Sequence, residues 1–460
     1  MIRLYNTKTL RVQEFHPIKE GHVNMYVCGP TVYNYAHIGN ARPMVVFDVL
    51  KRLFEAEGYT VTYASNFTDV DDKIIKKAAD EGTTEAVIAE RYIDAYQEVR
   101  KLLNTELPDI TPRVTETMDE IIAFINELML SGHAYEANGD VYFSVDSVPT
   151  YGEISHQKLN MLEAGARIET GDIKEDPMDF CLWKGAKPGE PYWESPWGKG
   201  RPGWHIECSA MAGRYLGKTI DIDCGGLDLI FPHHENEIAQ SEAANGCEFS
   251  HYWMHNGFIN VDNHKMSKSL NNFFTVRDVA EKYGYEPIRY LMISSQYRSP
   301  INYSVDIIEQ AKNSLERLYT CRDNIDFALK NAVDGGEIPA FIEERKNEFI
   351  VAMEDDLNTA DAIAAIFMLV RDINTAIANG AGKATLEACA DMFDQLTGVL
   401  GLVYNRKTEA LDSEIEALIE KRTEARKNKD FKTADAIRDQ LKEMGIVLED
   451  TPQGVKWSRS

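Results

Sequence analysis

Apolar residues near the amino terminus alternate between strand-like and helix-like spacing. Residues 24–27 form a short apolar run that Cys28-Gly29-Pro30 breaks, which predicts a buried strand ending in a tight turn. From Asn40 onward the apolar positions recur at helical spacing, and residues 60–66 show the β-rich alternation of another strand. A strand, a helix and a strand in this order predict a parallel α/β sheet.

The pattern changes after Pro108 and Pro112. Residues 116–130 have the spacing of an amphipathic helix, whereas residues 140–200 have the pattern of short strands and loops, with many glycines and prolines between 185 and 203. Strand-like or helical patterns then return in three segments: residues 219–223, 236–244 and 252–261. We therefore expect the middle stretch to be an insertion into the sheet domain.

From about residue 305 the apolar spacing becomes helical. Only Pro339 and Pro452 occur after Pro300, so little interrupts a helix there. Heptad-like spacing runs through four segments: residues 308–328, 341–353, 359–377 and 386–403. These segments predict an α-helical bundle. A short last unit follows residue 410, and in it we expect a helix and then a small hairpin.

Composition narrows the class of protein. The 460 residues are 44% hydrophobic and 27% charged, as in a globular chain long enough for several domains with their own cores. No run of about 18 apolar residues occurs, and residues 1–10 lack the apolar core of a signal peptide. We therefore expect a cytoplasmic protein that does not enter a membrane.

Cysteine usage and charge limit the kinds of site and partner. The seven cysteines are scattered and include no CxxC pair, so a metal site would draw its ligands from distant segments. The net charge of −25 argues against a general nucleic-acid binder and against a DNA partner, because phosphates require lysine and arginine. Residues 421–442 differ, with eight Lys or Arg against four Asp or Glu. They form either a local basic face for RNA or a solvated helix face with ion pairs.

The segment His37-Ile38-Gly39-Asn40 is a candidate anion site. It lies between a strand end and a helix start, where free backbone N–H groups and the helix dipole face an anion. Gly39 lets a flat ring approach the backbone, and His37 could hydrogen-bond a phosphoryl oxygen. Asn40 can donate a hydrogen bond but carries no charge. The alternative is an ordinary turn with a surface histidine.

Lys265-Met266-Ser267-Lys268-Ser269, here called the lysine loop, follows a β-like run. Its two lysines and two hydroxyls can wrap a triphosphate and stabilise charge that grows in a transition state. Taken by itself, the segment could also be a polar surface loop.

Four separated residues are candidate metal ligands. His233 and Glu237 are four positions apart, a spacing that puts both side chains on one helix face. Cys28 and Cys208 could complete a Cys₂-His-Glu set, and zinc accepts all of these donors. The competing candidates are His234 and Glu235. The alternative is two buried thiols and a solvated helix start.

The segments that carry these residues resemble cysteinyl-tRNA synthetases of the bacterial type, which are class I aminoacyl-tRNA synthetases. The ligand-bearing segments are Cys28-Gly29-Pro30-Thr31-Val32-Tyr33, Gly203-Trp204-His205-Ile206-Glu207-Cys208-Ser209-Ala210-Met211 and Phe231-Pro232-His233-His234-Glu235-Asn236-Glu237. The similarity runs from Tyr5 to Gly454. It departs at Asn40, where the family motif usually ends in histidine, and at Asp223-Cys224-Gly225-Gly226, where relatives often have a histidine followed by three glycines. The second departure removes an imidazole near the substrate, and Cys224 adds a thiol that could compete for metal.

The resemblance implies an α/β fold in six segments. A Rossmann-like parallel-sheet catalytic domain is split by a connective insertion and followed by an α-helical bundle and a small C-terminal α+β anticodon-side domain. The expected bounds are 1–115 and 204–258 for the two catalytic halves, 116–203 for the insertion, 259–304 for a linking segment with the lysine loop, 305–404 for the bundle and 405–460 for the C-terminal unit.

The resemblance also implies a two-step reaction. L-cysteine and ATP, accompanied by Mg²⁺, would form cysteinyl-adenylate, and the cysteinyl group would then pass to tRNA(Cys). The expected ATP-binding residues are His37, Gly39, Asn40, Lys265, Ser267 and Lys268. Among them, His37, Lys265 and Lys268 would be catalytic, the two lysines by stabilising charge on the leaving pyrophosphate.

Substrate selection would depend on one Zn²⁺ per chain. By resemblance its ligands are Cys28, Cys208, His233 and Glu237. The expected cysteine pocket consists of Gly29, Thr68, Trp204 and His205. A thiolate binds zinc far better than an alcohol does, so serine would be rejected without a separate editing domain. On sequence alone, Trp204 could instead be a core residue.

The C-terminal unit would contact tRNA through Arg426, Lys427, Phe431 and Lys432. Phe431 could stack on a base or belong to the core of the last helix. We expect a monomer.

Three other functions remain open: a cysteine ligase of the same lineage that acts on an amino-sugar, which would lack residues 405–460; a nucleotidyltransferase, which would leave the zinc set unexplained; and a catalytically inactive tRNA-binding protein, against which His37 and Lys268 argue.

Overall fold

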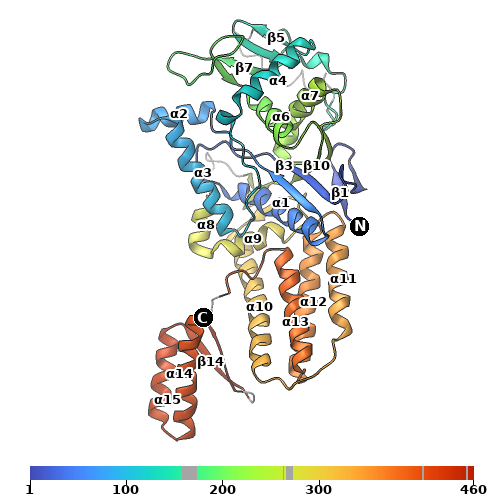
Figure 1. The fold of residues 1–460 in the computed structure, drawn as a ribbon. Coiled ribbons are helices and arrows are strands. Elements are labelled where there is room, and N and C mark those ends of the chain that lie inside the picture. The colour runs from blue at the N-terminus through green and yellow to red at the C-terminus, as the bar shows by residue number, and fades with distance from the viewer. Residues whose placement is uncertain (158–172, 263, 266–272, 407–408, 452–453, 460) are drawn as a thin grey trace. The chain divides into compact units, whose positions relative to one another are not determined.

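A computed structural model describes residues 1–157, 173–262, 264–265, 273–406, 409–451 and 454–459. The chain divides into two compact units, and Figure 1 traces its elements in order. The first unit is Met1–Ala311 with Val351–Asp361, and the second is Lys312–Ile350 with Ala362–Ser460. No described helix combines the length and the apolar character needed to cross a lipid bilayer.

A parallel sheet lies at the centre of the first unit, with its strands in the order β10-β9-β3-β4. The strands are β3 (His22–Val27), β4 (Thr60–Ala64), β9 (Ile220–Gly226) and β10 (Ser250–Asn256). Helix α1 (Ile38–Ala56) connects β3 to β4. The predicted strand, helix and strand of a parallel α/β sheet are therefore confirmed. The carboxyl ends of these strands meet at one edge, where open α/β sheets bind their ligands.

Several elements of this unit were not predicted from the apolar pattern. Strands β1 (Arg3–Asn6) and β2 (Arg11–Glu14) form an antiparallel pair. Helices α2 (Asp72–Glu81) and α3 (Glu85–Leu102) follow β4, and each begins at a side-chain cap. These caps are Asp71 and Thr84, whose side chains accept hydrogen bonds from Lys73 N and Val87 N, a common way to satisfy the free N–H groups of a helix start.

The segment between β4 and β9 contains a four-stranded antiparallel sheet in the order β5-β6-β7-β8. Its strands are β5 (Ala134–Ala137), β6 (Asp140–Phe143), β7 (Phe180–Gly185) and β8 (Gly200–Pro202). The neighbouring helices are α4 (Met118–Leu130), α6 (Trp204–Tyr215) and α7 (Glu235–Asn245). Their apolar residues share one buried cluster with those of β3 and β10, including Ile125, Phe143, Ile206 and Trp253. This shared core fixes the start of α6 against the parallel sheet.

The strand-like pattern expected at residues 252–261 is confirmed, and it is divided between two strands that belong to different sheets. The chain leaves the parallel sheet after β10, and β11 (Ile259–Val261) pairs instead with β12 (His264–Lys265) and β13 (Ile301–Tyr303). The break lies at Gly257, where a side chain would meet the Ser299 carbonyl oxygen at 2.6 Å. Helices α8 (Val276–Tyr283) and α9 (Tyr285–Ile293) complete this part.

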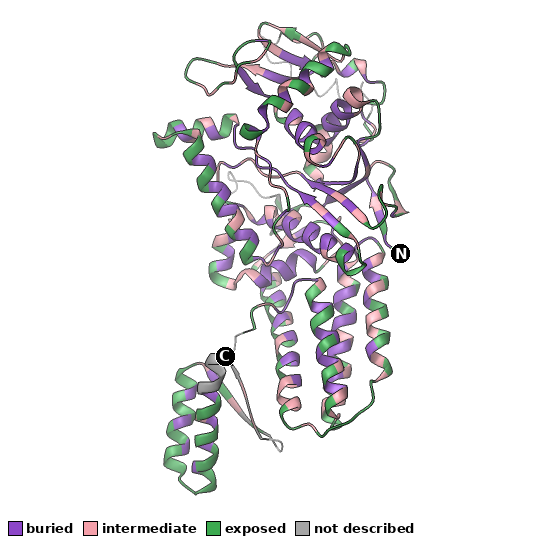
Figure 2. Cartoon of the chain, in the orientation of Figure 1, coloured by how far each residue is buried: buried purple, intermediate pink, exposed green. Residues whose placement is uncertain are grey.

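The four segments with heptad-like spacing after residue 305 are helical, as predicted. The bundle helices are α10 (Val305–Lys330), α11 (Ala340–Glu354), α12 (Thr359–Ala378) and α13 (Lys383–Val399). Each covers most or all of a segment with heptad-like apolar spacing. Their buried positions face the inside of the bundle and their exposed positions face outward (Figure 2).

The end of the chain has two helices before its hairpin, not one. They are α14 (Glu409–Lys427) and α15 (Phe431–Glu443), followed by β14 (Ile446–Thr451) and β15 (Gly454–Arg459). Residues 421–442 are interrupted because Lys429 has a φ of 61° and Asp430 caps a new helix by accepting from Thr433 N at 3.1 Å. A small core unites the two helices and the hairpin, with Ile419, Leu441 and Ile446 among its members.

Candidate metal centre and active site

The parallel sheet directs three strand ends toward one group of polar side chains. Cys28 follows β3, and its backbone N–H donates to the carbonyl oxygen of Cys224 in β9 at 3.1 Å. His255 lies near the end of β10. Cys208 comes from α6, while His233 and Glu237 flank the start of α7.

The four predicted zinc ligands lie together. Cys28, Cys208, His233 and Glu237, here called the first ligand set, each have a ligand atom within 4.8 Å of the others. Cys28 Sγ is 3.8 Å from Cys208 Sγ and 3.7 Å from Glu237 Oε2. His233 Nε2 is 3.9 Å from Glu237 Oε2. A metal ion that drew these donors in slightly would reach bonding distance to all four.

The chemistry of the first ligand set fits a zinc ion. Burial, with His205 nearby, lowers the pKa of His233 well below its usual value, so its imidazole is neutral and able to ligate. Glu237 is fully buried, yet its Oε1 forms no hydrogen bond with any described residue. A buried carboxylate oxygen without a donor is costly unless a cation satisfies it.

The two competing ligand candidates behave differently. His234 faces the centre, because its Nε2 lies 3.2 Å from Cys28 Sγ. Glu235 does not, because its carboxylate accepts from the backbone N–H groups of Gly152 and Ser155 at 2.8 Å each. The thiol of Cys224, expected as a possible competitor for metal, belongs to neither group of described residues arranged to hold an ion.

A second arrangement of donors overlaps the first. Cys28, Asp223, His234 and Glu237, here called the second ligand set, also have ligand atoms within 4.8 Å of one another. Asp223 was noted from the sequence only as a departure from the family. Its side chain is completely buried, and neither carboxylate oxygen has a hydrogen-bond partner among the described residues.

The predicted cysteine pocket adjoins the first ligand set. The Trp204 and His233 rings lie 4.3 Å apart between centroids, and His205 Nδ1 is 3.0 Å from His233 Nδ1. Trp204 is 41% exposed, so the alternative that it is a core residue is wrong. The Thr68 hydroxyl donates to Glu207 Oε2 at 2.8 Å. A hollow of about 200 Å³ is lined by Trp204, His205 and Glu207 among others.

Gly29, the fourth predicted pocket residue, lies where two loops approach closely. Its backbone N–H donates to Asn66 Oδ1 at 2.8 Å. A Cβ at this position would lie 1.6 Å from the Asn66 carbonyl oxygen. Only glycine therefore fits here without moving the loop that carries Cys28.

The candidate anion site His37-Ile38-Gly39-Asn40, here called the phosphate turn, begins α1. His37 is the residue before the helix, and its backbone N–H donates to Asn40 Oδ1 at 3.0 Å. The same turn pairs with the segment after the lysine loop, since Ile38 N donates to Phe274 O at 3.0 Å and His37 forms a bridge with Thr275. The fold thus brings the turn beside one flank of the lysine loop. The backbone of Lys265 lies in β12, whereas Ser267 and Lys268 lie outside the described residues. Gly39 is within the first turn of α1.

The predicted tRNA-contacting residues surround the turn between α14 and α15. Arg426 Nη1 lies 2.6 Å from Asp450 Oδ2, so part of its hydrogen-bonding capacity is used within this unit. Lys427 and Lys432 are exposed. Phe431 is 62% exposed, so the alternative of a core aromatic is wrong.

Three residues of the centre were missed from the sequence. His255 Nε2 lies 2.7 Å from His234 Nδ1, and its Nδ1 lies 2.8 Å from the Thr7 hydroxyl. Asn66 holds Gly29, as described above. A polar residue near the end of a largely apolar strand was the available signal for His255, whereas nothing local marked Thr7 or Asn66.

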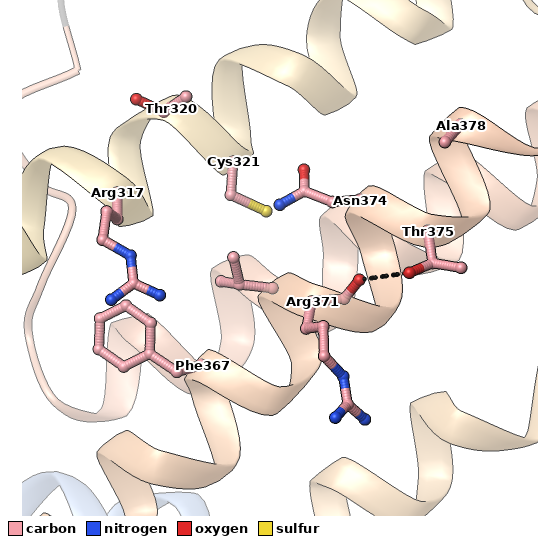
Figure 3. Close-up of a pocket in the computed structure, with 9 residues that line it drawn as sticks. Arg317, Thr320, Cys321, Phe367, Arg371, Asn374, Thr375 and Ala378 are labelled. Carbon is pink, nitrogen blue, oxygen red and sulfur yellow. Dashed lines mark hydrogen bonds between the residues drawn. The ribbon is translucent and has the colours of Figure 1, made fainter.

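The helical unit has its own open groove of about 590 Å³ between α10 and α12 (Figure 3). The guanidinium of Arg317 lies over the Phe367 ring, 4.6 Å from its centroid, and Arg371 lies farther along α12. No acidic side chain is among the described residues that line the groove. It contains none of the predicted site residues.

Three family models together match nearly the whole chain. A model of the tRNA synthetases class I (C) catalytic domain matches residues 14–313. A DALR domain model matches residues 348–404, and a model of the cysteinyl-tRNA ligase anticodon binding domain matches residues 408–457.

Individual relatives agree. A cysteine–tRNA ligase from Caldicellulosiruptor saccharolyticus is 53% identical over 464 residues and covers 100% of both chains. One from Bacillus licheniformis is 54% identical over 463 residues, covering 100% of this chain and 99% of its own.

Solved structures support the fold. Methionyl-tRNA synthetase of Mycobacterium tuberculosis, in complex with methionyl-adenylate, has a TM-score of 0.61 at 15% identity, covering 82% of this chain and 89% of its own. The leucyl enzyme of Agrobacterium radiobacter has a TM-score of 0.62 at 11% identity, covering 84% and 85%. The expected class I architecture, a Rossmann-like domain followed by helical domains, is confirmed. The chain belongs to the cysteine–tRNA ligase family of class I aminoacyl-tRNA synthetases.

Proposed function

We propose that this chain joins L-cysteine to tRNA(Cys) through a cysteinyl-adenylate. The observation that carries the proposal is the first ligand set, two thiols, an imidazole and a carboxylate within 4.8 Å of one another, at the ligand-binding edge of a parallel sheet. Among the amino acids, cysteine has the side chain that such a soft centre recognises best. The exposed ring of Trp204 forms a wall beside it.

Selection of cysteine over serine would take place at the first ligand set. A zinc ion held there supplies a Lewis acid that prefers a thiolate to an alcohol. Helix α6 carries Cys208 and helix α7 carries Glu237, and Gln240 joins the two helices. Its Nε2 donates to the backbone carbonyl of His205 at 3.0 Å and to the Ser209 hydroxyl at 3.1 Å. Shape alone would discriminate near-isosteres by only about 100-fold.

Activation of the carboxylate would take place along the neighbouring turn. His37 and the first N–H groups of α1 would bind the phosphates of ATP, because the start of a helix favours anions. Lys265 and Lys268 would stabilise charge on the leaving pyrophosphate, and Mg²⁺ would accompany the nucleotide. Asn40 would orient the turn through its bond to His37 N, a role that needs no charge.

Transfer to tRNA would use the second unit. Lys427, Phe431 and Lys432 are the proposed contacts with the anticodon end, and Arg317 in the groove of the helical unit offers a further cation to an RNA backbone. We also propose that the protein acts as a monomer in the cytoplasm.

The test is pyrophosphate exchange with ATP, followed by charging of tRNA. We expect exchange that depends on cysteine, little exchange with serine, and cysteinylation of tRNA(Cys). Equal exchange with serine would contradict the selection mechanism. Exchange without charging of tRNA, together with ligation to an amino-sugar, would favour the alternative ligase.

A further inference from the structure

We propose that the second ligand set, Cys28, Asp223, His234 and Glu237, is a second seat for a divalent transition-metal ion. It shares Cys28 and Glu237 with the first ligand set, and the proposal is that two ions bind at the same time, one in each set. The inference rests on the proposed zinc seat and extends it with Asp223 and His234.

Asp223 supplies the main argument. It lies in β9 with an exposed fraction of 0%, and both carboxylate oxygens lack a hydrogen-bond partner among the described residues. Ionised carboxylates are almost never buried in this way, because the loss of hydration must be compensated by donors, by a cation or by uptake of a proton. The nearest described cation candidate is His234, whose Nε2 is 3.8 Å from Asp223 Oδ1, too far for a hydrogen bond.

His234 is held in the orientation of a ligand. Its Nδ1 lies 2.7 Å from His255 Nε2, and His255 in turn contacts the Thr7 hydroxyl at 2.8 Å. This chain of contacts fixes the ring and turns Nε2 toward Cys28 Sγ and Asp223. Metal-binding histidines are held in the same way, by a partner on the nitrogen that does not bind the metal.

Charge balance is compatible with two ions. With every donor bound, Cys28 and Cys208 are thiolates and Glu237 and Asp223 are carboxylates. One divalent ion offsets half of this negative charge, and the acidic groups that it does not bind would be neutralised by protons. Two divalent ions offset all of it. One sulfur, one nitrogen and two carboxylates are a donor set for zinc, or for cobalt(II) as a spectroscopic substitute.

The test counts metal ions in the full-length protein. The background carries Cys247→Ser, because Cys247 is an exposed free thiol that would bind zinc adventitiously. The protein is stripped with a chelator, saturated with zinc, freed of loose metal and measured by elemental analysis. We expect about two zinc ions per chain, and about one after Asp223→Asn. Cys224→Ala is the matched control, since this neighbouring thiol is in neither ligand set, and it should retain two.

Cobalt(II) titration gives a second measurement on the same proteins. We expect two successive equivalents with different sulfur-to-metal absorption, because the first ligand set holds two thiolates and the second holds one. The second equivalent should disappear in Asp223→Asn. Saturation of the starting protein at one ion, or two ions in Asp223→Asn, would overturn the proposal while leaving the first seat intact. Binding of no ion at all would overturn both seats, and with them the proposed selection of cysteine.

Discussion

At the scale of single residues, the close approach of two backbone segments limits which side chains fit beside the metal centre. Gly29 directly follows Cys28, and its amide donates to Asn66 Oδ1. A methyl group on this residue would overlap the Asn66 carbonyl oxygen. The position of the Cys28 thiol, and with it both ligand sets, therefore depends on a residue that carries no functional group.

Gly29→Ala should displace the loop that carries Cys28. We expect a loss of about 1–3 kcal/mol in the free energy of unfolding, as for overpacked cores, together with a large fall in cysteine-dependent exchange. Gly213→Ala is the matched control, because a Cβ there meets nothing within 4 Å and alanine favours a helix. Full exchange activity in Gly29→Ala would show that the loop accommodates the methyl group.

The role of Lys268 rests on the sequence, since this residue lies outside the described part. If its charge stabilises the leaving pyrophosphate, Lys268→Ala should slow adenylate formation by roughly 100-fold, about 3 kcal/mol, while cysteine binding changes little. Single-turnover kinetics and equilibrium binding separate the two. Lys282→Ala, in the exposed part of α8, should leave both unchanged. An equal effect of both substitutions would refute a specific role.

At the scale of elements, a buried ion pair joins α1 to α9. Arg289 Nη2 lies 2.6 Å from Asp48 Oδ2, and both side chains are almost completely buried. Arg289 Nη1 also donates to the carbonyl oxygens of Leu103 and Asn104, at 3.0 Å and 2.9 Å. The helix that starts at the phosphate turn is thus fixed to the segment that follows the lysine loop.

Asp48→Ala should leave the Arg289 guanidinium buried without its carboxylate. We expect the first unit to lose about 3–5 kcal/mol of stability, measured by denaturant unfolding followed in that unit. Asp355→Ala removes one partner of an exposed pair, in which Arg3 Nη1 and Asp355 Oδ1 are 3.3 Å apart, and should cost less than about 1 kcal/mol. Similar losses in the two variants would mean that the buried pair adds nothing beyond a surface pair.

At the scale of the whole molecule, charge decides how RNA can be held. A chain with a net charge of −25 repels a polyanion at long range, so binding must depend on local cations. The turn between α14 and α15 exposes Lys427, Phe431 and Lys432 together. Cations and an aromatic side chain are a common combination for single-stranded RNA.

Lys427→Glu combined with Lys432→Glu should weaken tRNA binding without affecting adenylate formation. Each lost phosphate contact should make the slope of log affinity against log salt shallower by about 0.7. Arginine at both positions preserves the charge and is the matched control, with affinity near that of the unchanged protein. If the glutamate variant charges tRNA with an unchanged salt dependence, the turn is a solvated surface and the contact lies elsewhere.

The sequence by itself determined the local elements and the identity of the chemical groups. Helical spacing after Asn40 and strand-like spacing at residues 60–66 depend on neighbours along the chain, so α1 and β4 could be predicted. The family resemblance then assigned Cys28, Cys208, His233 and Glu237 to one site, and their ligand atoms lie within 4.8 Å.

Only the tertiary structure decided which distant groups meet and how they are oriented. The contact of His234 with His255 and the approach of Gly29 to Asn66 each join separate strands or loops, and the burial of the Asp223 carboxylate depends on elements packed around it. The break at Gly257 likewise depends on Ser299, far along the chain. Such contacts follow from packing between elements, which periodicity does not encode, because a repeat of apolar residues specifies a buried face but not the neighbour that covers it.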